Sequence, residues 1–272
     1  MPNFGQISRL VSLVVAGLVL TALVEMPTWT LPLIVLDSPL TLRLSGPWLI
    51  TAVLVILACA GTDVLLRLHP ALDERGFRHT APAWVVPGTM AAVAPFVIVQ
   101  FEPWSVRWLL VLAGAGVGLS LALLGEVHAA DPCDRHFHAA RASLTTLAYA
   151  TALLLFTAIY AAHVRTVLSG TAISLISFLL AMSLFRWSAR EDSMLWPYAA
   201  PTALIVGLAT WGLNHMHLDS LAGGGLLLLV FYLVTGVAQQ LIQRDLSRRV
   251  LIEFAVAAVL GLLLIGLSAR GG

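Results

Sequence analysis

Long apolar runs, separated by short breaks that carry most of the arginines, constrain this chain more than any other feature. Charged residues make up only 11% of its 272 residues, whereas a soluble domain typically has about a quarter. This small number of charged residues cannot cover the surface of a water-soluble domain. Hydrocarbon must therefore surround most of the chain. The composition therefore predicts an integral membrane protein and excludes soluble α/β and β-rich folds.

Nine windows of the sequence are long and apolar enough to cross a bilayer, which takes about 20 mostly apolar residues. They predict spans over residues 8–25, 47–66, 82–101, 105–127, 143–162, 166–186, 195–213, 220–241 and 250–268. We therefore expect an all-α fold, a polytopic transmembrane helix bundle in which residues 1–272 form a single domain. Because no small-x-small cleavage site follows the first run, we interpret that run as an uncleaved span rather than a secretory signal.

The arginines give the orientation, because cytoplasmic loops are enriched in Lys and Arg. Nine spans place eleven of the fifteen basic residues on the side of the N-terminus: Arg9, Arg67, Arg75, Arg78, Arg135, Arg141, Arg186, Arg190, Arg244, Arg248 and Arg249. The other four are Arg43, Arg107, Arg165 and Arg270. We therefore predict a cytoplasmic N-terminus and an external C-terminus.

The outer connection between the first two spans has a different periodicity. Leu40, Leu42 and Leu44 alternate with polar residues, and the segment from Trp29 to Val35 alternates likewise. A period of two is typical of β-strands, and the sequence Asp37-Ser38-Pro39 favours a turn. We predict a small external β-hairpin over residues 28–46, with an irregular apolar loop as the alternative.

The sequence excludes several classes of activity. All fifteen basic residues are arginine, so Schiff-base chemistry and a phosphate-binding P-loop, which need lysine, are excluded. No hydrolase or metalloprotease motif occurs, and a net charge of +1 gives no indication of nucleic-acid binding. An enzyme is therefore disfavoured, and the sequence identifies no cofactor.

Ionisable residues are nearly absent from the middle of the predicted spans, although a proton- or sodium-coupled carrier usually keeps a carboxylate there. Polar residues gather instead at the cytoplasmic ends: Asp63, Arg67, Glu126, His128, Gln239, Gln240 and Glu253. We expect Asp63 and Arg67, four residues apart, to pair along one helix face. This layer has two interpretations, solvation at the headgroups or the lining of a cytoplasm-facing cavity.

Two groups of residues could ligate a metal. In the inner loop, Cys133, His136 and His138 could surround zinc together with His128 or Asp131, although Asp131-Pro132 also favours a turn and Asp134 a helix cap. On the outer side His163, His215 and His217 could hold a metal or ligate haem, with ordinary interfacial residues as the alternative.

The third span contains Pro87 and Pro95, each of which removes a backbone donor from a helix. We expect this span to bend near both prolines, with Thr89 supplying a partner for one of the freed carbonyl groups. Broken spans often border a binding cavity, so Pro87, Thr89 and Pro95, with Asp63 and Arg67, are the candidate ligand-binding residues. The alternative is a proline kink without a ligand.

Small residues predict close helix packing at two places. Gly114 and Gly118 form a Gly-x-x-x-Gly pair in the fourth span, and Gly223-Gly224-Gly225 opens the eighth. We interpret both as packing seams within the bundle, with docking of another subunit as the alternative.

The segment from Leu221 to Phe254 includes Leu-Ala-Gly-Gly-Gly-Leu, Val-Phe-Tyr-Leu-Val-Thr-Gly-Val-Ala-Gln-Gln and Arg-Arg-Val-Leu-Ile-Glu-Phe. It resembles a bacterial family of multi-pass membrane proteins of unknown function, which implies a location in the bacterial plasma (inner) membrane. The favoured function is a non-catalytic scaffold or accessory subunit, in contact with the lipid bilayer and other membrane subunits. The alternatives are a carrier or binder of a small apolar molecule such as a lipid or isoprenoid, and a membrane-embedded metal or haem enzyme.

Overall fold

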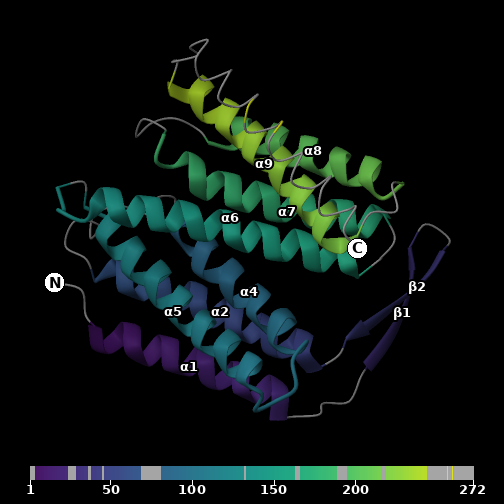
Figure 1. Cartoon of the computed structure of the whole chain (residues 1–272), viewed down its shortest axis with the longest axis horizontal. Coiled ribbons are helices and arrows are strands. Elements are labelled where there is room, and N and C mark those ends of the chain that lie inside the picture. The colour runs from purple at the N-terminus through teal and green to yellow at the C-terminus, as the bar shows by residue number, and fades with distance from the viewer. Residues whose placement is uncertain are drawn as a thin grey trace. The chain divides into compact units, whose positions relative to one another are not determined.

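The computed structural model describes residues 4–23, 29–35, 38–44, 46–68, 81–131, 133–162, 166–188, 195–215 and 219–243, together with Val256 and Val259. Within these residues the chain forms eight α-helices, a 3₁₀ turn and a β-hairpin (Figure 1). The chain divides into two compact units, residues 1–144 and 145–272, and the boundary falls inside one helix. A single transmembrane domain stays a prediction.

The helices coincide in position with the first eight predicted spans. They are α1 (Phe4–Leu23), α2 (Gly46–Arg67), α4 (Val85–Ile98, preceded by the 3₁₀ turn η1, Ala81–Trp84), α5 (Val106–Ala129), α6 (Phe137–Ala161), α7 (Thr166–Phe185), α8 (Trp196–Leu213) and α9 (Ser220–Gln243). Among the described residues, six helical segments are long and apolar enough to cross a membrane. The helical fold is therefore confirmed, and its long apolar helices are compatible with a membrane protein. The ninth predicted span, 250–268, lies outside the described residues apart from Val256 and Val259.

The predicted hairpin is present. Strand β1 (Trp29–Val35) pairs antiparallel with β2 (Ser38–Leu44), in a register that opposes Trp29 to Leu44 and Val35 to Ser38. Both strands lie within the predicted residues 28–46, so the period of two in this segment does indicate strands.

In the first unit, glycines bring α1 and α2 into close contact. Gly17 of α1 packs on the side chain of Leu54, and Gly61 of α2 packs on that of Leu10. The two contacts run in opposite directions along the chain, so the helices are antiparallel and each inserts a leucine where the other lacks a Cβ. In hydrocarbon, where water does not drive helices together, such close packing is the main source of association.

Helix α4 lies in the interior of the first unit. Gly88 packs on the Cys59 thiol of α2, and Met90 packs on Gly118 of α5. Of the span Ala81–Ile98, 61% is buried, against 33% of the spans in α2 and α5. The predicted glycine pair of the fourth span is thus only half used within the described residues, because Gly118 contacts Met90 whereas Gly114 has no atom within reach of a Cβ.

The irregularity of the third span lies at its start, where the 3₁₀ turn η1 gives way to the α-helix at Val85. Pro87 falls in the first turn of α4, where the backbone donors need no partner within the helix, and α4 continues through Pro95. The predicted role of Thr89 is wrong: its hydroxyl donates to the carbonyls of Val85 (2.8 Å) and Val86 (3.0 Å). Within α4 it is Pro95 that frees a carbonyl, that of Ala91 four positions before it.

In the second unit α9 packs on α6. Gly223 lies against the ring of Tyr160, and Gly224 lies against the backbone of Thr157. The Tyr160 hydroxyl also donates to the Leu213 carbonyl at the end of α8 (3.1 Å). The interpretation of Gly223 and Gly224 as an internal seam is therefore confirmed.

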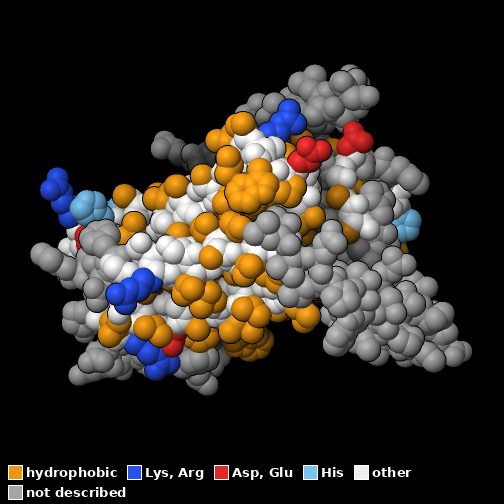
Figure 2. Space-filling model, turned by 90° about the horizontal axis from the view of Figure 1, so that it is seen from below, with side chains coloured by type: hydrophobic (Ala, Val, Ile, Leu, Met, Phe, Trp, Pro, Cys, Tyr) orange, Lys and Arg blue, Asp and Glu red, His pale blue; other side chains and the backbone are white. Residues whose placement is uncertain are grey.

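Hydrophobic side chains are spread over the described helices on the face seen in Figure 2. Val53 and Ile56 of α2, Val117 of α5, and Leu204 and Leu208 of α8 are all more than half exposed. The largest side chains among those fully buried are also apolar, for example Trp108, Phe156 and Phe231. Helices that are apolar on both their buried and their exposed faces are typical of membrane spans.

Candidate metal centre

The turn between α5 and α6 is held by its own aspartates. The Cys133 backbone N–H donates to Asp131 Oδ1 (2.9 Å), and the Asp134 backbone N–H donates to the Asp131 carbonyl (3.1 Å). Short polar side chains that accept from the backbone two residues further on are typical of turns. The turn predicted at Asp131 is therefore present, and it presents the next carboxylate, Asp134, in a defined position.

Asp134 leads into α6. Its Oδ1 accepts the backbone N–H of His136 (2.9 Å). The His136 carbonyl accepts the N–H of Ala140 (2.8 Å), which is the first hydrogen bond between residues four apart at the start of this helix. The predicted capping role of Asp134 at the start of this helix is confirmed, since it satisfies a donor that the helix leaves without a carbonyl partner.

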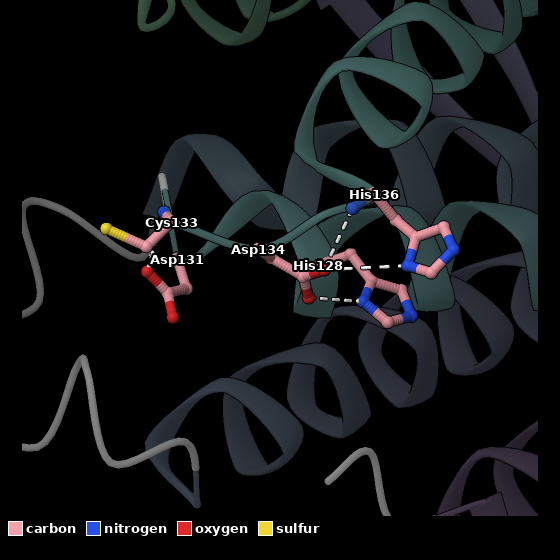
Figure 3. A network of polar contacts seen from close by, with 5 residues as sticks. All are labelled: His128, Asp131, Cys133, Asp134 and His136. Atoms are coloured by element: carbon pink, nitrogen blue, oxygen red, sulfur yellow. Dashed lines mark hydrogen bonds and ion pairs between the residues drawn. The ribbon is translucent and has the colours of Figure 1, made fainter.

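The same carboxylate joins two imidazoles. His128 Nδ1, from the last turn of α5, lies 2.7 Å from Asp134 Oδ2, and His136 Nδ1 lies 3.5 Å from Asp134 Oδ1. The two rings lie 5.4 Å apart, centroid to centroid, on the same side of Asp134 (Figure 3). One ligand atom from each of the three residues falls within 4.8 Å of the others, close enough for all three to hold one metal ion.

The site is open to solvent but not fully exposed. About a quarter of the side chains of His128 and Asp134 is accessible, whereas His136 is mostly exposed. The hydrogen bond from the His128 imidazole and the backbone N–H of His136 lower the pKa of the Asp134 carboxyl from 3.8 to about 2. Asp134 is therefore a carboxylate near neutral pH.

The structure changes the ligand set that the inner loop was predicted to supply. His128 and His136 come together, but the Cys133 thiol points away from them (Figure 3), and His138 packs edge-on against Phe137 instead. Asp131 contacts the backbone of Cys133. The third candidate ligand in the structure is Asp134, for which the sequence indicated only a capping role. Its position six residues after His128 and two before His136, across a turn, is the signal that would have identified it.

The outer histidine set stays a prediction. His215 Nδ1 lies 2.9 Å from the Trp211 carbonyl, and the two rings are 5.1 Å apart. His163 and His217 lie outside the described residues.

Asp63 and Arg67 form the predicted ion pair, with Arg67 Nε 2.6 Å from Asp63 Oδ2. The Arg67 side chain is 63% exposed and that of Asp63 20%. Asp63 Oδ1 is buried and has no hydrogen-bond partner among the described residues. A ligand-binding role for this pair stays a prediction, as it does for Pro87, Thr89 and Pro95.

These features define a helical protein with apolar helices long enough to cross a membrane, and with a histidine–aspartate cluster at the turn between α5 and α6. The chain belongs to a family described as "protein of unknown function (DUF5656)", whose model matches residues 26–268. The resemblance first seen in residues 221–254 is confirmed and extends over nearly the whole chain. No curated protein and no solved structure matches it.

Proposed function

We propose that the protein is a non-catalytic scaffold or accessory subunit of a complex in the bacterial plasma (inner) membrane, with nine spans, a cytoplasmic N-terminus and an external C-terminus. The observation that carries this proposal is where the charges lie. In the described helices every Asp, Glu, Arg and His lies within two turns of a helix end, and α4, α7, α8 and α9 contain none.

An ion-coupled carrier needs an ionisable group deep in the membrane to bind its ion or proton. In the described spans the polar side chains away from the helix ends are hydroxyls and the Cys59 thiol. The hydroxyls of Thr62, Thr151 and Thr210 donate to carbonyls of their own helices, and the Cys59 thiol donates to the Trp84 carbonyl. Such a bundle is suited to packing against lipid and other subunits. The exposed apolar faces of α2, α5 and α8 supply the contact area.

Purification under mild conditions tests this function. The chain, tagged at its N-terminus and expressed from its native promoter, should be recovered from the membrane in lipid nanodiscs with a second membrane protein in fixed stoichiometry. A tagged, unrelated multi-pass protein of similar abundance is the control. Recovery of the chain alone, or only with proteins that the control also recovers, contradicts a scaffold role.

A second candidate, a binder of a small apolar molecule, is favoured by the interior position of α4. Pro95 frees the carbonyl of Ala91 inside this helix, next to packing partners from α2 and α5. Lipid extraction tests it: one lipid or isoprenoid per chain should resist detergent exchange in the wild type and be lost in Pro95→Leu. Extracts with no defined stoichiometry remove this candidate.

A further inference from the structure

We infer that His128, Asp134 and His136 form a binding site for a divalent transition metal ion of the zinc type, which joins the end of α5 to the start of α6. The site rests on the juxtaposition of two imidazoles and one carboxylate at a single turn (Figure 3). It does not depend on the proposed scaffold role, because a metal tie between two helices is compatible with any function of the bundle.

The donor types select the metal. Imidazole nitrogens suit zinc, copper, nickel and iron, whereas magnesium and calcium prefer sites made of oxygen alone. Zinc in particular binds histidine and carboxylate ligands and takes four ligands in all. Two histidines and one aspartate leave the fourth position for water, and the partial exposure of the cluster leaves it accessible.

The geometry requires only a small adjustment. Ligands at 2.0–2.1 Å from a tetrahedral zinc ion lie about 3.3 Å from one another. His128 Nδ1 and Asp134 Oδ2 are 2.7 Å apart, a hydrogen-bond distance, so the two groups must separate slightly when an ion replaces the shared proton. His136 Nδ1 lies 3.5 Å from the other Asp134 oxygen, and its ring is exposed enough to turn toward the ion.

The turn holds these ligands in place through bonds that use other atoms. Asp131 fixes the backbone at Cys133 and Asp134, and the backbone N–H of His136 fixes the Asp134 carboxylate. His128 is carried by the last turn of α5. The side chains of His128 and Asp134 are therefore largely in place before the ion binds, which favours affinity, and it is the exposed His136 ring that binding must order.

Two neighbours provide matched controls. Cys133 and His138 are themselves good zinc ligands and lie within three residues of the proposed ones. However, the Cys133 thiol points away from the cluster (Figure 3), and His138 contacts Phe137. Removing either one should leave the proposed site intact.

The experiment is equilibrium dialysis of the purified full chain, free of any histidine tag, against Zn²⁺ in detergent. The wild type should bind one Zn²⁺ per chain. His128→Ala, Asp134→Ala and His136→Ala should each weaken binding about tenfold or more, whereas Cys133→Ser and His138→Ala should bind as the wild type does. Co²⁺ should bind competitively and give a visible absorption spectrum that the three variants lack.

Each variant is first tested for folding, as a single symmetric peak in size-exclusion chromatography. Where Asp134→Ala aggregates, it is replaced by Asp134→Asn, which keeps the size of the side chain. Three results overturn the site: binding well below one equivalent in the wild type, unchanged binding in His128→Ala and His136→Ala, or equal loss in Cys133→Ser and His138→Ala.

Discussion

Gly224 of α9 packs directly against the backbone of Thr157 in α6, so closely that a Cβ on Gly224 would lie 2.8 Å from both Cα and N of Thr157. Backbone atoms cannot rotate away, so the helices must separate to admit even a methyl group. Glycine is therefore required here by the close approach of two helices.

The first prediction follows from this contact. Gly224→Ala should destabilise the protein by about 1–3 kcal/mol, the usual cost of overpacking, and lower the melting temperature of the detergent-solubilised chain. Gly212→Ala, in α8, is the matched control, because no atom of the described residues lies within 4 Å of a Cβ there. Equal melting temperatures for the two variants would contradict the packing of α9 on α6.

The second prediction concerns the hydrogen bond between Tyr149 and Thr235, 3.0 Å long. The buried Thr235 hydroxyl donates to the Phe231 carbonyl (2.7 Å), so Tyr149 must donate to Thr235. Tyr149→Phe should cost about 0.6 kcal/mol, the average for an interhelical bond in a membrane. Thr235→Val should cost more, about 1–3 kcal/mol, because it leaves the tyrosine donor without an acceptor. Thermal denaturation of both variants checks the order, and the reverse order would refute the assigned donor.

The third prediction uses the backbone of Trp104, which has a φ of 68° although it is not glycine. Trp104→Gly and Trp104→Val both remove the ring that lies 5.5 Å from that of Trp108. They differ in the backbone, because a β-branched residue disfavours positive φ and glycine does not. The valine variant should therefore be less stable than the glycine variant by about 1–2 kcal/mol. Equal stabilities would mean that this residue does not adopt the left-handed conformation.

The fourth prediction is a small effect. Arg67→Gln should lower stability by no more than about 0.5 kcal/mol, since the Arg67 side chain is largely exposed and an ion pair four residues apart on a helix contributes little. A loss comparable to that of Gly224→Ala would show that Arg67 has a buried partner besides Asp63.

The positions of the helices could be predicted because hydrophobic length is a local property of the sequence. Every described helix lies at a predicted span, and the alternation around Leu42 indicated the hairpin. The partners of small residues could not be predicted in this way. Gly114 and Gly118 share one spacing signal, yet in the part of the chain that the structure describes Gly118 meets another helix and Gly114 does not. The partner depends on how distant segments pack.

The candidate site was only partly predictable, for a related reason. His128 and His136 were recognised as candidate ligands from their chemistry. For Asp134 the sequence indicated a capping role. In the structure its Oδ1 accepts the backbone N–H of His136 at the start of the helix, and its Oδ2 contacts His128. The sequence indicates one role for a side chain that has two. For Pro87 the sequence indicated an effect that the structure does not show. The predicted span begins at residue 82, whereas α4 begins at Val85, so Pro87 falls in the first turn, where a proline does not break the helix.

The orientation of the two ends tests the central claim, a nine-span membrane protein, most directly. Alkaline phosphatase fused after Gly272 should be active, because an odd number of spans places the C-terminus outside. The same reporter fused after Arg190, in a predicted cytoplasmic loop, should be inactive. Inactivity after Gly272, with a cytoplasmic fluorescent fusion active at the same position, would contradict nine spans and an external C-terminus.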